Sequence, residues 1–123
     1  MQEQAIIILG HGSKSVDAIE DFNYIVKTFS EKSGNRRVFG AHMELTDPSL
    51  EAVVSEIGHS EKNEQVIVIP YFLYNGNHIK KDIPGKIEKL QDQYPHLDIK
   101  LGEPIGKEDR MVELLLQKLK EIQ

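Results

Sequence analysis

Four short apolar runs alternate with four longer segments in which apolar residues recur every three or four positions, and this alternation constrains the fold most strongly. The short runs cover residues 4–9, 37–43, 65–71 and 97–101, and the first run is apolar on both faces. Strands of that kind are typical of parallel sheets that helices cover on both sides. The order βαβαβαβα therefore predicts a three-layer α/β fold with a doubly wound parallel sheet of four strands.

The first two helices carry recognisable start and stop signals. The spacing of apolar residues predicts a helix over about residues 14–32, which Ser33-Gly34-Asn35 would end. Ser13 stands where an N-cap of this helix is expected. Asp47 is expected to cap the second helix, with Pro48 at its first position.

The last two helices are expected to differ in character. The third lies near residues 79–93, and Pro84 is expected to mark its true start after an irregular stretch over residues 78–83. Asp109 is expected to cap the fourth helix, which is amphipathic. The apolar residues that share one face of this helix are Met111, Leu115, Leu119 and Ile122.

Composition limits the kinds of partner. The chain has 123 residues and no cysteine, which excludes disulfide bonds, thiolate ligands and a cysteine nucleophile. Its 15 basic and 20 acidic residues give a net charge of −5 and form no basic stripe of the kind that binds nucleic acid. The short apolar run after the polar N-terminus is too short for a signal peptide or a membrane span. We therefore expect one domain over residues 1–123, in a cytoplasmic protein that binds neither nucleic acid nor membranes.

Three polar side chains follow three of the predicted strands. His11 stands between Gly10 and Gly12 after the first strand, Glu44 follows the second, and His78 lies in the loop after the third. The carboxyl ends of parallel strands meet at one edge of the sheet, where ligands bind. Two imidazoles and a carboxylate suit a divalent transition metal such as Fe, Co, Ni or Zn, and three protein ligands leave coordination positions open. The same groups could instead move protons, and each of them taken alone could be structural.

Other polar residues near this edge have more than one interpretation. The backbone N–H groups of Gly12-Ser13 could bind an anion, although a capping role is the simpler explanation of the serine. Lys14, Lys80 and Lys81 could meet carboxylates of a ligand or could simply be solvated. His42 could be an alternative metal ligand, but a partly buried structural histidine is the simpler interpretation.

Two other enzyme classes fit the sequence poorly. Enzymes that form a phosphohistidine place Arg-His-Gly at the end of the first strand, whereas Leu9-Gly10 precedes His11 here, so the arginine that would hold phosphate is missing. Hydrolysis by a Ser-His-Asp triad would need a Gly-x-Ser-x-Gly turn, which the chain lacks. A plain interaction domain with incidental histidines is a further alternative, and it predicts no effect of metal on stability.

Several motifs taken together resemble those of the sirohydrochlorin chelatases, the class II enzymes that insert cobalt, iron or nickel into a reduced tetrapyrrole. The resemblance is to the short, CbiX-like form and spans nearly the whole chain. The third block, with its glycine, histidine and Asp-Ile-Pro, is the most specific part. The motifs are Gly10-His11-Gly12-Ser13, Glu44 with Asp47-Pro48-Ser49, Pro70-Tyr71-Phe72-Leu73, Gly76-x-His78, Asp82-Ile83-Pro84 and Gly102-x-Pro104-Ile105-Gly106.

The resemblance implies a flavodoxin-like, chelatase-like fold and an enzyme that inserts a divalent metal into sirohydrochlorin, as in cobalamin or siroheme synthesis. His11 and His78 would bind the metal and accept pyrrole protons, and Glu44 would match an acidic residue near the metal. Phe72, Leu73 and Tyr74 could wall the tetrapyrrole or simply pack. The residues expected to border the tetrapyrrole are Gly12, Ser13, Leu73 and Gly76.

The resemblance also implies the partners of the chain. Long members of the family carry two such domains in one chain, so a homodimer is expected here, with the tetrapyrrole near a cleft between the copies. The metal (Co²⁺, Fe²⁺ or Ni²⁺) would be a substrate, and no permanent cofactor is expected. Lys14 departs from the arginine of many relatives, which leaves the contact to substrate carboxylates open. A carrier of metal or tetrapyrrole that does not catalyse insertion is the alternative function, because it needs the same ligands.

Overall fold

The computed structural model describes residues 3–73 and 76–123, apart from the side chains of residue 3 and of residues 77–80. Strands and helices alternate along these ranges. The elements are β1 (Glu3–Gly10), α1 (Val16–Ser33), β2 (Val38–His42), α2 (Leu50–Gly58), β3 (Glu64–Pro70), α3 (Asn77–Gln93), β4 (Leu97–Leu101) and α4 (Asp109–Glu121). All strand pairs are parallel and the strand order is β2-β1-β3-β4. The predicted α/β fold and its element order are therefore confirmed.

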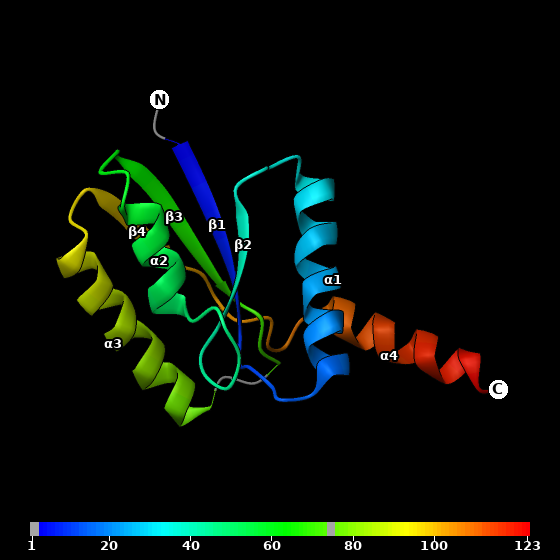
Figure 1. Ribbon diagram of the computed structural model, residues 1–123. Coiled ribbons are helices and arrows are strands. Elements are labelled where there is room, and N and C mark those ends of the chain that lie inside the picture. Colours follow the sequence, from blue (N-terminus) through cyan, green and yellow to red (C-terminus); the bar gives the residue numbers. More distant parts are fainter. Residues whose placement is uncertain (1–2, 74–75) are drawn as a thin grey trace.

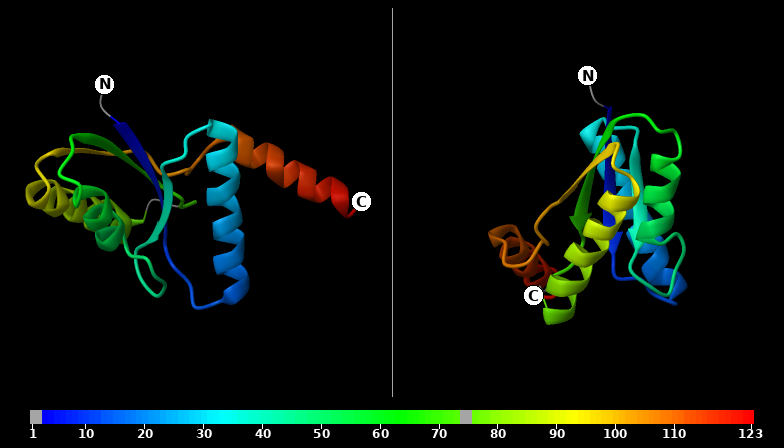
Figure 2. Two further views of the ribbon diagram at one scale, coloured as in Figure 1. Left: turned by 45° about the horizontal axis from the view of Figure 1, so that its top comes forward. Right: turned by 90° about the vertical axis from the view of Figure 1, so that its left-hand side faces the viewer.

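Helices lie on both faces of the sheet. α1 lies on one face, and α2 and α3 lie on the other (Figures 1 and 2). The chain moves in one direction from β1 to β2 and in the opposite direction from β2 through β3 to β4. Because parallel crossovers are right-handed, this reversal places α1 opposite α2 and α3. The reversal also makes the carboxyl ends of β1 and β3 the topological switch point, where doubly wound sheets bind ligands.

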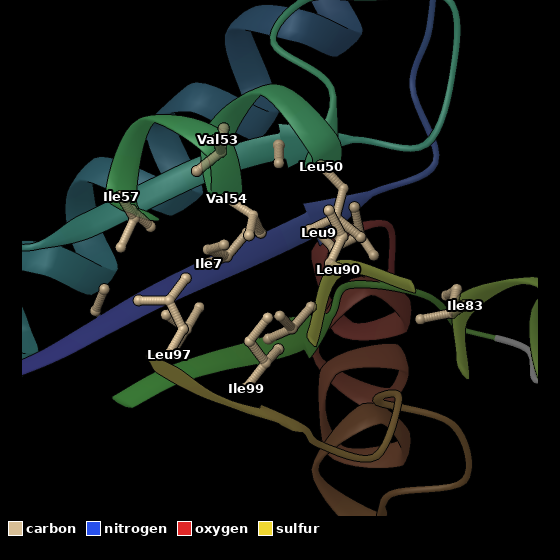
Figure 3. Close-up of a cluster of buried hydrophobic side chains, with 14 of the residues drawn as sticks. Ile7, Leu9, Leu50, Val53, Val54, Ile57, Ile83, Leu90, Leu97 and Ile99 are labelled. Atoms are coloured by element: carbon tan, nitrogen blue, oxygen red, sulfur yellow. The ribbon is translucent and has the colours of Figure 1, made fainter. Parts of the chain in front are cut away.

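A cluster of buried apolar side chains fills the space between the sheet and helices α2 and α3 (Figure 3). Alternate residues of each strand point into it, because successive side chains of a strand face opposite sides of the sheet. Full burial of one such side chain stabilises the fold by about 1.5–3 kcal/mol. The cluster includes Ile7, Leu9, Leu50, Val53, Val54, Ile57, Ile83, Leu90, Leu97 and Ile99.

The face of the sheet towards α1 is less completely covered. Ile6 and Ile8 of β1 and Phe22 of α1 are buried on this side. Ile67 and Ile69 of β3 alternate with the buried valines of that strand and therefore face α1, on the side opposite to those valines. Both isoleucines are only half-buried. Part of this apolar face is thus open in a single copy of the chain.

The first helix starts later than predicted. α1 begins at Val16 and is capped by Ser15, whose hydroxyl accepts a hydrogen bond from the Ala18 N–H (3.4 Å). Ser13 is not the N-cap, because its hydroxyl instead accepts a hydrogen bond from the Ser15 N–H (3.0 Å). The end is as predicted, with Gly34 in the left-handed conformation (φ +71°) as the C-cap.

The second helix also starts later than predicted. Ser49 caps α2, and its hydroxyl accepts a hydrogen bond from the Ala52 N–H (3.1 Å), so the prediction of Asp47 as the cap is wrong. Pro48 is not helical, because its carbonyl oxygen accepts a hydrogen bond from the His42 N–H (2.9 Å) at the end of β2. Pro48 is thus hydrogen-bonded to the end of β2 and is not part of α2.

The third helix contains Pro84, against the prediction that the proline marks its start. Residues 78–83, expected to be irregular, are helical. A proline inside a helix removes one backbone hydrogen bond and disfavours the turn before it. Burial of Ile83 and Leu90, with Ile87 packed between them, offsets this loss because helical geometry places all three on the core side. Pro84 itself is exposed.

The fourth helix extends away from the rest of the molecule (Figures 1 and 2). Its amphipathic pattern is as predicted, but none of its residues is buried. Asp109 is the first helical residue rather than the cap, a position that Glu108 occupies without a side-chain hydrogen bond. The exposed apolar side chains of α4 are Val112, Leu114, Leu115, Leu116, Leu119 and Ile122. Across residues 3–73 and 76–123, no helix has the length and apolar character needed to cross a membrane.

Candidate functional site

His11 and Glu44 meet at the carboxyl edge of the sheet. His11 follows β1 directly, and Glu44 lies just beyond the end of the neighbouring strand β2. The Nε2 atom of His11 lies 3.2 Å from Oε1 of Glu44. The two side chains are 54% and 58% exposed, so both can reach a ligand that arrives from solvent. The structure thus brings together two of the three residues that the sequence singled out.

The backbone holds this pair in place. The Met43 N–H donates to the Gly10 carbonyl (3.0 Å), and the Glu44 N–H donates to the His11 carbonyl (3.2 Å), so the ladder continues past both strands. Gly12 has a φ of +105°, and a Cβ there would lie 1.7 Å from the Glu44 carbonyl oxygen. Only glycine fits so close an approach. The close backbone approach therefore explains why residue 12 is a glycine. A contact of Gly12 with a tetrapyrrole stays a prediction.

Thr46 fastens the loop after β2 to the turn after β1. Its hydroxyl oxygen accepts a hydrogen bond from the Ser13 N–H (3.2 Å), and the same hydroxyl donates to the Ser13 carbonyl. The Ser13 N–H is therefore already engaged and does not serve the anion site considered from the sequence. Sequence reasoning missed Thr46, because a contact across 33 positions leaves no local signal.

His78 is the third residue that the sequence singled out. It lies in the first turn of α3, at the carboxyl end of β3, and Gly76 caps this helix with an extended backbone (φ −68°, ψ 163°). The side chain of His78 lies outside the described part of the structure. Among the described side chains, no third His, Asp or Glu joins His11 and Glu44 to complete a metal site. A contact of His78 with a metal stays a prediction.

The segment after β3 borders the same edge. Phe72 is buried in the core, and its ring meets that of His11 edge-on with 6.1 Å between the centroids. Core packing is therefore the role that the structure gives Phe72. Leu73 is 51% exposed and available to a ligand. Tyr74 lies outside the described residues.

Two cavities meet at His11. The smaller, of about 190 Å³, is bounded by α3, and its lining includes Glu44 and Asp82. The larger, of about 490 Å³, is bounded by α1 and the turn after β1. Phe22, His42 and Tyr71 line the larger one. His11 therefore borders both a small cavity lined by charged side chains, Lys86 among them, and a larger, mostly apolar one.

His42 is the last residue of β2 and is 5% exposed. Its ring packs against that of Phe22, with 4.8 Å between the centroids. Its Nδ1 atom is buried and has no hydrogen-bond partner among the described residues. Desolvation by burial lowers the pKa of His42 below the ordinary value of 6.5. The sequence favours a partly buried structural histidine, and the burial is confirmed and nearly complete. In the described part of the structure, no side-chain hydrogen bond explains why a histidine stands at this position.

We expect His42 to make the protein less stable in mild acid. Below about pH 6.5 the unfolded chain protonates this histidine while the folded chain keeps it neutral, so stability falls with pH by at most about 1.4 kcal/mol per unit. The free energy of unfolding, measured in denaturant from about pH 7.5 to about pH 5.5, should fall more for the wild type than for His42→Phe. Parallel pH profiles for the two proteins would contradict this assignment.

Comparison with known proteins identifies the family. Residues 5–122 match the sequence model of the CbiX family. The chain belongs to the CbiX family. This CbiX-family chain is 26% identical to the sirohydrochlorin cobaltochelatase of Methanococcus aeolicus, over 95% of the chain and 98% of that protein. It is 30% identical to the chloroplastic sirohydrochlorin ferrochelatase of Arabidopsis thaliana, over 89% of the chain and 48% of that protein.

A solved structure shows the same fold. The sirohydrochlorin chelatase SirB from Bacillus subtilis subspecies spizizenii, in complex with cobalt, superposes on this CbiX-family chain with a TM-score of 0.89 and 26% identity. The superposition covers 98% of this chain and 51% of SirB. The chain thus spans about half the length of SirB and of the Arabidopsis relative.

Proposed function

We propose that this protein inserts a divalent metal into sirohydrochlorin. The observation that carries the proposal is the His11–Glu44 pair, 3.2 Å apart and exposed at the carboxyl edge of the sheet, with His11 at the topological switch point. The neighbouring start of α3 carries His78, which would complete a set of two imidazoles and a carboxylate. The names of the similar proteins support the reaction, since they are a cobaltochelatase, a ferrochelatase and a chelatase with cobalt bound.

The proposed ligands suit a metal that must be released. Imidazole nitrogens bind Co²⁺, Fe²⁺ and Ni²⁺, whereas three protein ligands leave coordination positions open. Glu44 offsets part of the positive charge of the ion, and its exposure keeps the metal accessible to the incoming macrocycle. The tetrapyrrole supplies four nitrogen ligands of its own, so the protein acts as a temporary holder and the metal is a substrate. No permanent cofactor is needed.

Insertion requires two proton transfers. The two pyrrole N–H groups lose their protons as the metal enters, and a side chain at the site has to accept them. The imidazole of His11 and the carboxylate of Glu44 are proposed for this role, and their exposure at one edge of the sheet supports the proposal. His78 is the second imidazole proposed to accept a proton. The bordering residues proposed for the macrocycle are Gly12, Ser13, Leu73 and Gly76.

Turnover with free substrates tests the proposal. Purified protein is mixed with sirohydrochlorin and Co²⁺, Fe²⁺ or Ni²⁺, and the visible spectrum of the tetrapyrrole is followed against the same mixture without protein. Conversion well above the uncatalysed rate is expected, and the rates rank the metals. Conversion no faster than in buffer, with tetrapyrrole binding intact, would favour the carrier function instead. The cytoplasmic location and the single domain over residues 1–123 stay predictions from the sequence.

We further propose that two copies of the chain assemble through α4. The apolar side chains of this helix are exposed, and half-buried Ile67 and Ile69 leave an apolar face of the sheet open on the side of α1. A symmetric dimer in which each α4 packs on that face of the other copy would bury both surfaces. SirB supports the proposal, because this chain covers only 51% of its length.

The proposed dimer predicts that a charged residue on the apolar face of α4 makes the dimer dissociate. Leu115→Asp should convert the dimer to monomers, because symmetry removes two buried leucines and about 3 kcal/mol or more of association free energy. Gln117→Asp is the matched control, since Gln117 lies on the polar side of the same helix. Sedimentation equilibrium measures the mass of each variant. A monomeric wild type, or a Leu115→Asp variant that stays dimeric, would overturn the assembly.

A further inference from the structure

The cavity of about 490 Å³ beside α1 is the largest described cavity that His11 borders. Its walls are mostly apolar and include the side chains of Ile19, Phe22, Ile25 and Tyr71. A cavity of this size and character suits part of a flat organic ligand, which apolar walls hold while a few polar groups fix its orientation. The cavity of about 190 Å³ that His11 also borders is lined by Glu44 and Asp82 together with Lys86, and it contains the two residues, His11 and Glu44, proposed to hold the metal.

His42 is the most buried polar group on the walls of the larger cavity. Its backbone position is fixed, because β2 pairs Gly10 with His42 and the His42 N–H donates to the Pro48 carbonyl (2.9 Å). Its Nδ1 has no hydrogen-bond partner among the described residues and almost no accessible surface, so a ligand in the cavity reaches this atom only if the ring turns. Buried polar atoms are almost always paired, and each one left without a partner destabilises the fold. Another aromatic ring would pack against Phe22 as well as His42 does. Packing therefore does not explain why this position is a histidine.

We infer that this cavity is a substrate subsite and that, when the tetrapyrrole binds, the His42 ring turns so that Nδ1 faces the cavity and donates a hydrogen bond to a carboxylate on the rim of the macrocycle. The inference rests on the proposed function and adds a recognition residue to it. His42 pairs in the sheet with Gly10, the residue before His11, so the two imidazoles belong to adjoining parts of one edge. A macrocycle with its central nitrogens at His11 therefore brings its rim, which carries the carboxylates, towards His42. A buried hydrogen bond to a charged group is among the stronger ones in proteins. Asp21 also lines the cavity, but its side chain is exposed and its charge is screened by solvent.

Binding of metal-free sirohydrochlorin, followed by its fluorescence or visible spectrum, tests the inference without catalysis. His42→Phe keeps an aromatic ring against Phe22 and removes the hydrogen bond, so the Kd should rise at least about 10-fold. His42→Gln keeps a donor and should bind more tightly than His42→Phe. Co²⁺ binding in the absence of tetrapyrrole should be the same in all three proteins, because His42 does not line the smaller cavity, where the metal is proposed to bind. An unchanged Kd in His42→Phe would overturn the inference.

A second pair of variants covers the case in which His42 variants do not fold. Ala18 is exposed, lines the cavity at the start of α1, and its N–H donates to the capping Ser15. Ala52 is exposed at the equivalent position of α2, donates to the capping Ser49, and does not line the cavity. Ala18→Phe should narrow the subsite and raise the Kd for sirohydrochlorin at least about 10-fold, whereas Ala52→Phe should not. Equal binding by these two variants would overturn the inference. Failure of the wild type to bind sirohydrochlorin would instead overturn the proposed function, and the inference with it.

Discussion

Replacing His11 with alanine is expected to lower the rate of metal insertion at least about 100-fold, because one change removes a residue proposed as both metal ligand and proton acceptor. The side chain is 54% exposed and lies 3.2 Å from Glu44, so its loss should leave the fold intact. Initial rates with Co²⁺ and sirohydrochlorin measure the effect, and circular dichroism checks the fold.

The matched control for this change is His59→Ala. His59 is exposed and follows α2, at the edge of the sheet opposite to the candidate site. Its removal should leave the rate within about twofold of the wild type. A His11→Ala variant that inserts metal at the wild-type rate would show that this histidine takes no part in the reaction.

Replacing Gly12 with alanine is expected to remove activity and at least about 3 kcal/mol of stability. The new Cβ would lie 1.7 Å from the Glu44 carbonyl oxygen, and the φ of +105° is strained for any residue with a side chain. The backbone cannot yield at one point only, because the Glu44 N–H is bonded to the His11 carbonyl. The strand ends must separate, which moves both proposed metal ligands. Denaturant unfolding and initial rates measure the two effects.

Comparison with Gly34→Ala separates the cost of a strained φ from the cost of the steric clash that Gly12→Ala creates with Glu44. Gly34 also has a positive φ (+71°), but nothing lies within 4 Å of the position where its Cβ would stand. Alanine there should cost about 1–2 kcal/mol and leave the insertion rate unchanged. Equal stability losses for the two variants would show that the contact with Glu44 does not constrain the site.

The sheet and its functional edge could be predicted because the relevant signals are local. The apolar run at residues 5–9 is short and rich in isoleucine, which favours a buried strand, and β4 runs from Leu97 to Leu101 as predicted. Once strands and helices alternate, the strands run parallel, and the residues after β1, β2 and β3 therefore lie at one edge of the sheet. That rule places His11 and Glu44 at the same edge, and the pairing of β1 with β2 then brings the two residues together.

The details that the sequence did not reveal depend on contacts between distant segments. Ser13 and Ser15 are equally good caps locally, and the bonds of Thr46 to the turn after β1 fix that turn. Pro84 is accepted inside α3 because burial of Ile83 outweighs one lost hydrogen bond. The apolar face of α4 has the same periodicity whether its own sheet or another molecule covers it, so the pattern could not predict that the helix leaves the domain.

Binding of Co²⁺ without tetrapyrrole tests the central claim most directly, because the claim is that His11, Glu44 and His78 form a metal site at one edge of the sheet. Visible absorption of bound Co²⁺ reports nitrogen and oxygen ligands, and thiolate bands cannot interfere because the chain has no cysteine. We expect the wild type and His59→Ala to bind Co²⁺ with the same spectrum and affinity. His11→Ala and His78→Ala should each bind at least about 10-fold more weakly with an altered spectrum. Wild-type affinity and spectrum in both His11→Ala and His78→Ala would contradict the proposed site.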